Sequence, residues 1–195
     1  MHPVEIERTL DSMTILVDTR ERPTDYSEKR YAQFGRPYRR EKLDVGDYSA
    51  EFTAPTGEII SLKDSVVVER KNSIDELCMC YTTERGRFER EFERAKNSGI
   101  KLYLLVENAT FESIYNGKYR SRMNPNALVA SILAWLARYD CQIIFCKAET
   151  IFNFDNRSVI KNCLAVHSAE YLMLVGNAYF DIDFCGSVKN GREFH

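Results

Sequence analysis

The chain has 195 residues, of which 44% are hydrophobic and 29% are charged. This composition is typical of a soluble globular protein of about one domain, large enough to bury a sizeable core. The 27 Lys and Arg residues nearly balance the 29 Asp and Glu residues, so the net charge of −2 neither indicates nor excludes a nucleic-acid partner. No apolar stretch approaches the ~18 residues of a membrane span and no signal peptide precedes the first strand, so we expect a cytoplasmic protein with no membrane partner.

Periodicity and turn residues predict alternating strands and helices between residues 14 and 146. We predict strands over 14–18, 38–45, 48–52, 59–62, 66–71, 100–106 and 142–145. We predict helices over 27–34, 73–81, 85–96 and 111–115, and a longer helix that starts after the N-cap Asn124 with proline in its first position. Residues 1–13 are polar and mixed, which indicates a frayed N-terminal extension.

The last predicted helix carries a hydrophobic stripe of five residues: Leu128, Ile132, Trp135, Leu136 and Tyr139. Such a stripe usually covers a sheet, although part of it could serve a partner. After residue 150 the pattern weakens. We therefore divide the chain into an extension (1–13), a main domain (14–150) and an uncertain segment (151–195), where we expect partial helix near 158–175 and the least order.

The six cysteines argue against a zinc site, because none forms a CxxC pair. Cys141 and Cys146 bracket an apolar run, which is typical of small buried residues. In the cytosol we expect all six to be free, reduced thiols.

A basic and aromatic stretch runs from Arg20 to Lys42. It holds eight basic residues against four acidic ones, with three tyrosines and a phenylalanine interleaved. Such a stretch can bind a phosphate backbone. The alternative is an ordinary solvated helix and strand, and the stretch alone does not decide between them.

The segment VVVERKNSID, from Val66 to Asp75, organises the rest of the chain. Three valines suit a buried strand, and side chains alternate along it, so Glu69 and Lys71 should share one face while Arg70 points to the other. Ser73 and Glu76 have the spacing of a capping box for the next helix. A lone ERK would usually be a solvated charge cluster at a strand end.

The ends of other strands also carry acids. Asp18 and Glu21 follow the first strand, and Asp47 follows a glycine between two predicted strands. Carboxylates gathered at one edge of a sheet repel one another unless a cation lies among them, and oxygen ligands favour Mg²⁺ or Mn²⁺. Together with Lys71, which could orient or activate a water, the pattern fits metal-dependent hydrolysis of a phosphodiester.

VDTRE, GDY and ERKxxxD, in this order and at these spacings, resemble the nuclease domain of the XPF family, also called the excision-repair cross-complementation group 4 domain. The resemblance covers about Thr14 to Cys146 and includes the segments RFEREFERA, LYLLVE and NPNALVASILAWLARY. It implies an α/β chain with the restriction-endonuclease-like (PD-(D/E)xK) fold, a central mixed β-sheet flanked by helices.

The resemblance also implies roles for eight residues. Asp47 and Glu69 would bind the metal with the carbonyl of Arg70, and Asp18 would be a further ligand, direct or through water. Lys71 would position the attacking water, and Arg20 would contact the scissile phosphate. Glu21 and Asp75 would orient their neighbours. An ordinary ion pair is the alternative for Arg20 and Asp75.

The sequence thus predicts a metal-dependent DNA endonuclease, acting on branched DNA in repair, recombination or phage DNA processing. The alternative is a catalytically silent DNA-binding or scaffolding partner, since the family includes such subunits. No helix-hairpin-helix pattern follows the domain, so the chain resembles the short stand-alone members of bacteria and phages. The small footprint of such a domain suggests a homodimer or a recruiting protein, and nothing in residues 151–195 matches the helix that the family places after the CQIIFC strand.

Overall fold

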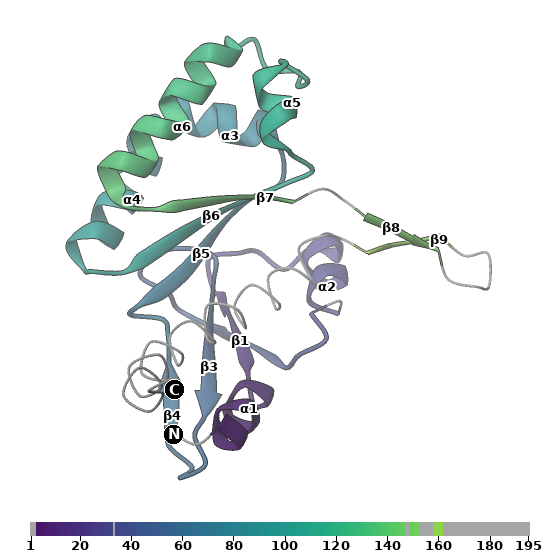
Figure 1. Cartoon of the computed structure of the whole chain (residues 1–195), viewed down its shortest axis with the longest axis vertical. Coiled ribbons are helices and arrows are strands. Elements are labelled where there is room, and N and C mark those ends of the chain that lie inside the picture. The colour runs from purple at the N-terminus through teal and green to yellow at the C-terminus, as the bar shows by residue number, and fades with distance from the viewer. Residues whose placement is uncertain (1–2, 33, 147–148, 153–157, 162–195) are drawn as a thin grey trace, which may run out of the picture.

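Seven strands form one mixed sheet in the computed structural model, which describes residues 3–32, 34–146, 149–152 and 158–161. The strands are β1 (Thr14–Asp18), β2 (Tyr38–Glu41), β3 (Tyr48–Thr53), β4 (Ile59–Ser61), β5 (Val66–Lys71), β6 (Lys101–Glu107) and β7 (Gln142–Cys146). Their order is β2-β1-β3-β5-β6-β7, with β4 paired to β3. The predicted central mixed sheet flanked by helices is confirmed (Figure 1).

The direction of the strands changes in the middle of the sheet. β1 is parallel to β2 but antiparallel to β3, and β3 is antiparallel to β5. β5, β6 and β7 are all parallel. Parallel strands need crossover connections, which helices supply between β1 and β2, β5 and β6, and β6 and β7.

Strand β5 separates two hydrophobic cores, because its side chains alternate between the faces of the sheet. Val67 packs into one core, and Val66 and Val68 pack into the other. Continued to the end of the strand, this alternation puts Glu69 and Lys71 on the face of Val67 and Arg70 on the opposite face, as the sequence predicted.

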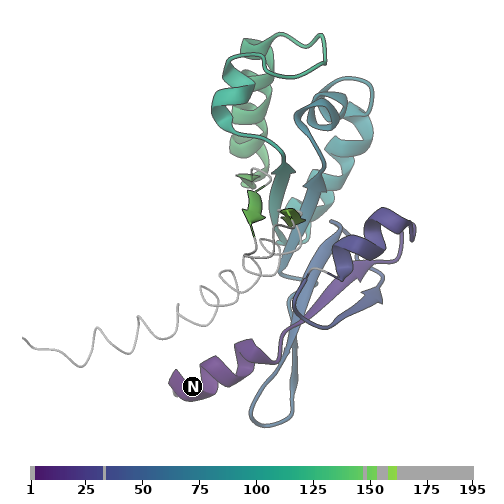
Figure 2. The same cartoon turned by 90° about the vertical axis from the view of Figure 1, so that its right-hand side faces the viewer.

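The larger core lies under helices α3 (Ile74–Tyr81), α4 (Arg85–Asn97) and α6 (Pro125–Tyr139), with the short α5 (Phe111–Tyr115) beside α6. Figures 1 and 2 show these helices gathered at the β5–β7 end of the sheet. Trp135 stacks on Phe88 with ring centroids 5.6 Å apart and meets Phe92 edge-on. Truncating a buried aromatic residue of this kind costs roughly 3–5 kcal/mol of stability.

The hydrophobic stripe of α6 belongs to this core. Four of its five residues are buried, and Leu136 is partly buried against them. Asn124 caps the helix, because its side-chain oxygen accepts hydrogen bonds from the backbone N–H groups of Asn126 (2.9 Å) and Ala127 (3.3 Å). The stripe therefore covers the sheet, and the alternative that part of it serves a partner is not supported.

On the opposite side, α1 (Pro3–Asp11) and α2 (Asp25–Tyr31) lie at the β1–β3 end. The prediction of a frayed extension over residues 1–13 is wrong for residues 3–11, which form a helix. Leu10, in the last turn of the helix, and Met13, just after it, are both buried in the core on this side of the sheet. The Ser12 hydroxyl also accepts a hydrogen bond from the Thr53 N–H at 2.7 Å, which joins this end to β3.

Two predicted boundaries need correction near the first strands. α2 begins at Asp25 rather than 27, because Thr24 and Ser27 form a reciprocal capping box. β2 ends at Glu41 instead of 45, because the chain then crosses toward the centre of the sheet. There the Asp47 N–H donates to the Val68 carbonyl, and the Asp18 N–H donates to the Asp47 carbonyl, each at 2.9 Å.

Beyond β7, β8 (Glu149–Phe152) and β9 (Ser158–Lys161) form an antiparallel pair. The helix expected near 158–175 is therefore wrong for residues 158–161, and the remainder of that expectation lies outside the described residues. The predicted boundary after residue 150 falls within β8.

Cys78, Cys80, Cys141 and Cys146 are buried and free, which confirms the expected thiols for these four, whereas Cys163 and Cys185 lie outside the described residues. None of the helices in the described ranges is long and apolar enough to cross a membrane.

Candidate active site

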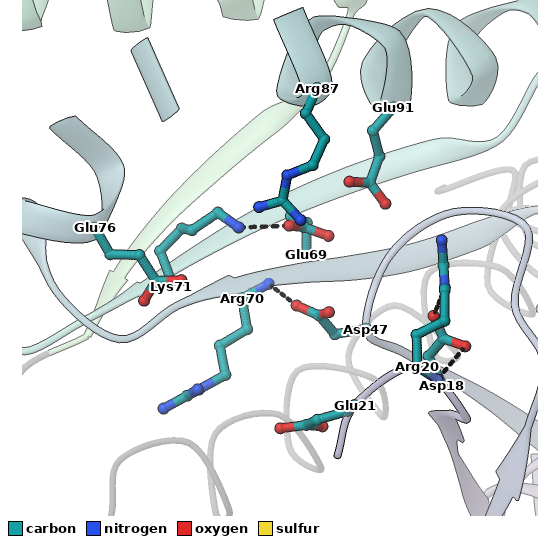
Figure 3. Close-up of a pocket in the computed structure, with 10 residues that line it drawn as sticks. All are labelled: Asp18, Arg20, Glu21, Asp47, Glu69, Arg70, Lys71, Glu76, Arg87 and Glu91. Atoms are coloured by element: carbon teal, nitrogen blue, oxygen red, sulfur yellow. Dashed lines mark hydrogen bonds and ion pairs between the residues drawn. The ribbon is translucent and has the colours of Figure 1, made fainter. Parts of the chain in front are cut away.

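A cleft of about 300 Å³ opens beside the end of β5, between α4 and the loops that follow β1 and precede β3. Figure 3 shows its ten lining residues: Asp18, Arg20, Glu21, Asp47, Glu69, Arg70, Lys71, Glu76, Arg87 and Glu91. The structure thus brings together seven of the eight residues that the sequence singled out; Asp75 does not line the cleft.

Glu69 and Lys71 form a buried ion pair at the end of β5. The Lys71 ammonium donates to Glu69 Oε1 at 2.5 Å, and it lies 5.3 Å from the centre of the Phe88 ring. Burial, together with the nearby negative charge of Asp47, raises the pKa of Glu69 to about 8. Burial opposes the charge of Lys71, but Glu69 and Asp47 attract it, and its pKa is raised.

Asp47 reaches the cleft from the loop before β3. Its Oδ2 accepts a hydrogen bond from the Arg70 backbone N–H at 2.8 Å, and among the described residues no donor bonds to Oδ1. Burial raises the pKa of Asp47 to about 6, although Lys71 and the Arg70 N–H oppose the shift. Asp47 and Glu69 therefore share a pocket in which two negative charges are costly, which is the condition that a cation relieves.

Gly46 fixes the position of Asp47. Its φ angle is +76°, and a Cβ at this position would lie 2.9 Å from Val67 Cβ and 3.1 Å from the Val68 carbonyl oxygen. Only glycine meets both conditions without strain. The Gly46 N–H also donates to Glu91 Oε1 at 3.2 Å, which ties the loop to α4.

Asp18 is buried at the end of β1, and protein groups engage both of its oxygens. The guanidinium of Arg20 is paired with Oδ2, and the Arg20 N–H donates to Oδ1 at 3.2 Å. Arg20 also donates to the Leu43 carbonyl at 3.1 Å. Arg20 is half exposed at the cleft, so in this arrangement Asp18 holds Arg20 in place.

Glu21 is held by α2 and β3. Its two oxygens accept hydrogen bonds from Arg30, from the Tyr31 hydroxyl at 3.0 Å and from the Tyr48 hydroxyl at 2.9 Å. Burial, with the charge of Glu21, raises the pKa of Tyr31 to about 12, so this tyrosine stays a hydrogen-bond donor. Glu21 is thus placed as an orienting residue.

Arg70 contributes its backbone to the cleft, while its side chain turns to the opposite face. Its guanidinium pairs with Glu107 at the end of β6 and donates to Asn72 Oδ1 at 3.1 Å. Glu107 was not singled out from the sequence. Its position after a buried strand, next to β5 in the sheet, is the signal that could have identified it.

Asp75 lies apart from the cleft, in the first turn of α3. Its Oδ1 accepts hydrogen bonds from the backbone N–H groups of Arg120 (2.9 Å) and Ser121 (2.7 Å), and Oδ2 accepts one from Arg120 Nε at 3.3 Å. Its neighbour Glu76 faces the cleft instead. The Glu76 carboxylate accepts a hydrogen bond from the Asn72 N–H at 2.8 Å. In a capping box it would accept one from the N–H of the N-cap residue, Ser73, so the observed contact is displaced by one residue.

Arg87 and Glu91 complete the wall of the cleft on α4, and the sequence reasoning missed them. Each directly precedes a buried phenylalanine, Phe88 or Phe92, so both lie on the flank of the face that packs on the sheet. Arg87 and Glu91 are thus four residues apart beside a buried helical stripe, and this spacing is the sequence signal that could have identified them. Arg87 is mostly exposed and pairs with Glu84.

The acidic side chains that line the cleft are all carboxylates, and carboxylate oxygens are ligands that suit Mg²⁺ and Mn²⁺. Within the described ranges, no three His, Cys, Asp or Glu side chains are already gathered around one point. Asp47 and Glu69 are the pair whose raised pKa values indicate that ionising both carboxyl groups in the buried pocket is unfavourable. The chemistry of these carboxylates therefore fits a divalent metal ion. In this structure one oxygen of Glu69 accepts a hydrogen bond from Lys71.

Comparison with known proteins gives a family. The family model of the ERCC4 domain matches residues 17–154, which is more than two thirds of the chain. The chain belongs to the ERCC4 domain family. The resemblance of VDTRE, GDY and ERKxxxD to XPF-type nuclease domains is thereby confirmed, and the family is one of structure-specific nucleases.

Two solved structures resemble this ERCC4 domain. XPF from Aeropyrum pernix has a TM-score of 0.51 and 20% identity over 83% of this chain and 60% of its own. XPF from Aeropyrum pernix in complex with DNA has a TM-score of 0.52 and 19% identity over 85% of this chain and 65% of its own. The fold is therefore restriction-endonuclease-like, as predicted. The chain covers less than two thirds of either XPF chain, and a search of curated proteins finds no match.

Proposed function

We propose that this ERCC4 domain is a metal-dependent endonuclease that hydrolyses phosphodiester bonds in branched DNA. The observation that carries the proposal is the pair Asp47 and Glu69, brought into one cleft from separate segments with Lys71 on the same strand face. Both carboxyl groups have raised pKa values, so the pocket is built at a cost in stability. Clustered buried acids in a cleft are more often functional than structural.

Asp47, Glu69 and the carbonyl of Arg70 are the groups that would hold the metal. A bound Mg²⁺ or Mn²⁺ would polarise the phosphate and lower the pKa of the attacking water. Asp18 has both oxygens engaged, so we assign it an indirect role, through water or through its hold on Arg20. Oδ1 of Asp47 is the oxygen that no described donor occupies.

Lys71 acts as a cation in this proposal. Its raised pKa keeps it protonated at neutral pH, so it cannot accept a proton from water. As an ammonium group it donates hydrogen bonds, which orient the attacking water and balance the charge of Glu69. Its burial against Phe88 limits it to few orientations.

Two arginines on opposite walls of the cleft would contact the DNA strand. Arg20 extends from the loop after β1, and Arg87 extends from the first turn of α4 (Figure 3). Both side chains are at least half exposed, and the guanidinium group of each is paired with a carboxylate, Asp18 or Glu84. A phosphate between them would receive donors from both sides, which stabilises charge that builds up during hydrolysis.

The basic stretch from Arg20 to Lys42 contributes less free charge than its sequence indicates. Arg30 is buried on Glu21, Arg36 pairs with Asp11, and Arg39 pairs with Glu41 and Glu51. Arg40 donates to the Thr19 and Glu21 carbonyls at 2.8 and 2.6 Å. Much of the stretch therefore holds the β1–β2 region together, while Arg22, Lys29 and Lys42 stay exposed and could still contact DNA.

A nuclease assay tests the proposal directly. The purified protein is incubated with flap, fork, splayed-arm and linear duplex DNA, in Mg²⁺, in Mn²⁺ and in EDTA. We expect cleavage of the branched molecules only when a divalent metal is present. Binding of branched DNA without cleavage in either metal would instead support the catalytically silent partner, and equal cleavage of linear duplex would remove the branched-substrate part.

Homodimerisation or recruitment by another protein remains a proposal, based on the small footprint that such a domain offers to DNA. The α6 stripe no longer supports it, because these side chains pack within the chain. Sedimentation at high concentration, combined with cleavage by the same sample, decides it. A monomer that cleaves branched DNA efficiently would show that no second copy is needed.

A further inference from the structure

The loop between α5 and α6 is basic and lacks acidic residues. Residues 113–139 contain Lys118, Arg120, Arg122 and Arg138 but no Asp or Glu. The first three of these lie in the loop of residues 117–123, and all three are exposed. For a chain with a net charge of −2, this is a local concentration of positive charge that neither the fold nor the cleft explains.

The loop has a defined conformation. Gly117 turns the chain with a φ angle of +64°, and the Lys118 N–H donates to the Ser113 carbonyl at 2.8 Å. The Tyr119 hydroxyl donates to the Met123 carbonyl at 2.9 Å, so the ends of the loop are bridged. A loop held this way presents its cations at fixed positions, which reduces the entropy lost when they bind a ligand.

Asp75, in the first turn of α3, joins this loop to the segment that directly follows β5. It is the last residue of ERKxxxD, yet it faces away from the cleft, and its hydrogen bonds go to the backbone of residues 120 and 121. Within the part of the chain that the structure describes, the Arg120 side chain is engaged only through its Nε group, and it is 91% exposed. The carboxylate therefore fixes the loop while leaving the end of the guanidinium free for another anion.

The distance from the cleft suits one continuous nucleic acid. Asp75 follows Lys71 by four residues, and four residues span at most about 14 Å between Cα atoms. On duplex DNA this equals about four base-pair steps at 3.4 Å per step along a strand. A strand that enters the cleft would therefore pass the loop within a few nucleotides of the scissile bond.

We propose that residues 117–123 form a second DNA-contact site, in which Lys118, Arg120 and Arg122 bind phosphates beside the cleft. In this site Asp75 is a positioning residue that fixes the loop to the start of α3, just after β5. The inference rests on the proposed function, because it takes DNA as the ligand of the cleft. It assigns the last residue of the ERKxxxD motif to substrate docking instead of hydrolysis.

The first test removes positive charge from the loop and leaves Asp75, which anchors the loop, unchanged. Lys118→Gln/Arg122→Gln is compared with Arg94→Gln/Lys96→Gln, which removes the same charge from exposed positions in the last turn of α4. That turn leads into the start of β6. Because β5 and β6 are parallel, the start of β6 lies at the opposite end of these strands from the cleft, which opens beside the end of β5. The dissociation constant for a labelled flap DNA is measured in EDTA, so that no cleavage occurs, at several salt concentrations.

We expect the slope of log K against log salt to fall in magnitude by about 2 in the loop variant, because each lost phosphate contact contributes about 0.9. Between 50 and 200 mM salt this changes the relative affinity by roughly tenfold. The α4 control should keep the wild-type slope. An unchanged slope in the loop variant, or an equal change in the control, overturns the proposal.

The second test asks whether Asp75 acts through its hydrogen-bond acceptor or through its negative charge. Asp75→Asn keeps an oxygen that can accept from the two backbone N–H groups, whereas Asp75→Ala removes it. We expect Asp75→Asn to bind DNA nearly as wild type and Asp75→Ala to bind as weakly as the loop variant, with little further loss when both changes are combined. Equal weakening by Asn and Ala contradicts the anchoring role.

Cleavage is measured separately, in single turnover at saturating flap DNA with Mg²⁺. The loop variant should cleave within about twofold of wild type, because its defect is in docking. A large loss of rate at saturation would place the loop in the hydrolytic machinery and overturn the proposal. If wild type itself does not cleave, the proposed function fails, while the salt dependence of binding still decides whether the loop contacts DNA.

Discussion

The ammonium group of Lys71 and Oε1 of Glu69 lie 2.5 Å apart, and each side chain is only 6% exposed. This pair occupies the carboxylate that a metal would need. Glu69→Gln and Asp47→Asn should each abolish metal-dependent cleavage, because each removes a negative ligand while preserving side-chain shape. Cleavage of flap DNA in Mg²⁺, alongside circular dichroism to confirm folding, checks this. Full activity in both folded variants would contradict the assignment of the site.

The same two carboxyl groups should make the metal-free protein less stable at higher pH. Their folded-state pKa values, about 6 for Asp47 and about 8 for Glu69, lie above the ordinary values near 4. The folded protein therefore keeps protons that the unfolded chain releases. The associated stability is fully present below pH ~4 and is lost as the pH rises through 6 and 8.

Urea unfolding in EDTA at several pH values measures this dependence. Glu69→Gln should be more stable than wild type at pH 8.5 by on the order of 1–2 kcal/mol, with the difference shrinking toward pH 5. Adding Mg²⁺ should stabilise wild type and leave the variant unchanged. A difference independent of pH would mean that the charge of Glu69 is compensated in some other way.

Arg20→Ala should reduce the rate of cleavage more than the affinity for DNA. Loss of a donor that acts on charge built up in the transition state typically costs about 100-fold in rate. Single-turnover rates and binding constants, compared with Arg22→Ala as an exposed neighbouring control, separate the two effects. Normal cleavage at saturating DNA with weakened binding would make Arg20 a docking residue.

Gly46→Ala should destabilise the protein by about 1–3 kcal/mol, because the new Cβ would meet Val67 and the Val68 carbonyl in a strained backbone conformation. Thermal unfolding measures this. Gly57→Ala, also at positive φ but with no atom within 4 Å of the new Cβ, isolates the cost of the contacts. Equal destabilisation by the two changes would show that packing around Gly46 has no part in it.

Glu91→Gln should retain cleavage that Glu91→Ala loses, because the amide oxygen can still accept the hydrogen bond from the Gly46 N–H. Glu93→Ala, at an exposed position on the same helix, is the control. If the Gln variant is as inactive as the Ala variant, the negative charge of Glu91 matters, and it belongs with Asp47 and Glu69 in the acidic cluster.

The sequence was informative wherever function depended on a local pattern. The alternation of β5 predicted which of Glu69, Arg70 and Lys71 share a face, and the resemblance to XPF-type domains predicted the fold and most of the cleft. It failed where geometry depends on distant partners. Arg87 and Glu91 enter the cleft only because α4 packs against β6, the neighbour of β5 in the sheet, and the target of Asp75 lies 45 residues further along the chain.

The same limit applies at the start of the chain. Residues 3–11 have few apolar side chains, but their spacing is amphipathic, and this was a signal for a helix. Contacts of Leu10 and Ser12 with the rest of the molecule then hold the helix in place. The sequence could not decide whether the Arg20–Lys42 stretch binds phosphate, because some of its counter-ions, Asp11 and Glu51, lie outside it. Composition within a window cannot reveal a partner beyond that window.

All the residues that line the cleft lie between positions 18 and 91, whereas β6 pairs with β5 only after residue 101 has been made. During synthesis the ribosome will therefore release every cleft side chain before the strand that completes their support. Until β6 emerges, the nascent chain displays β5 with an unpaired edge and three consecutive valines. Exposed strand edges of this kind invite aggregation. A pause in translation just after α4 would therefore leave the nascent chain prone to aggregation.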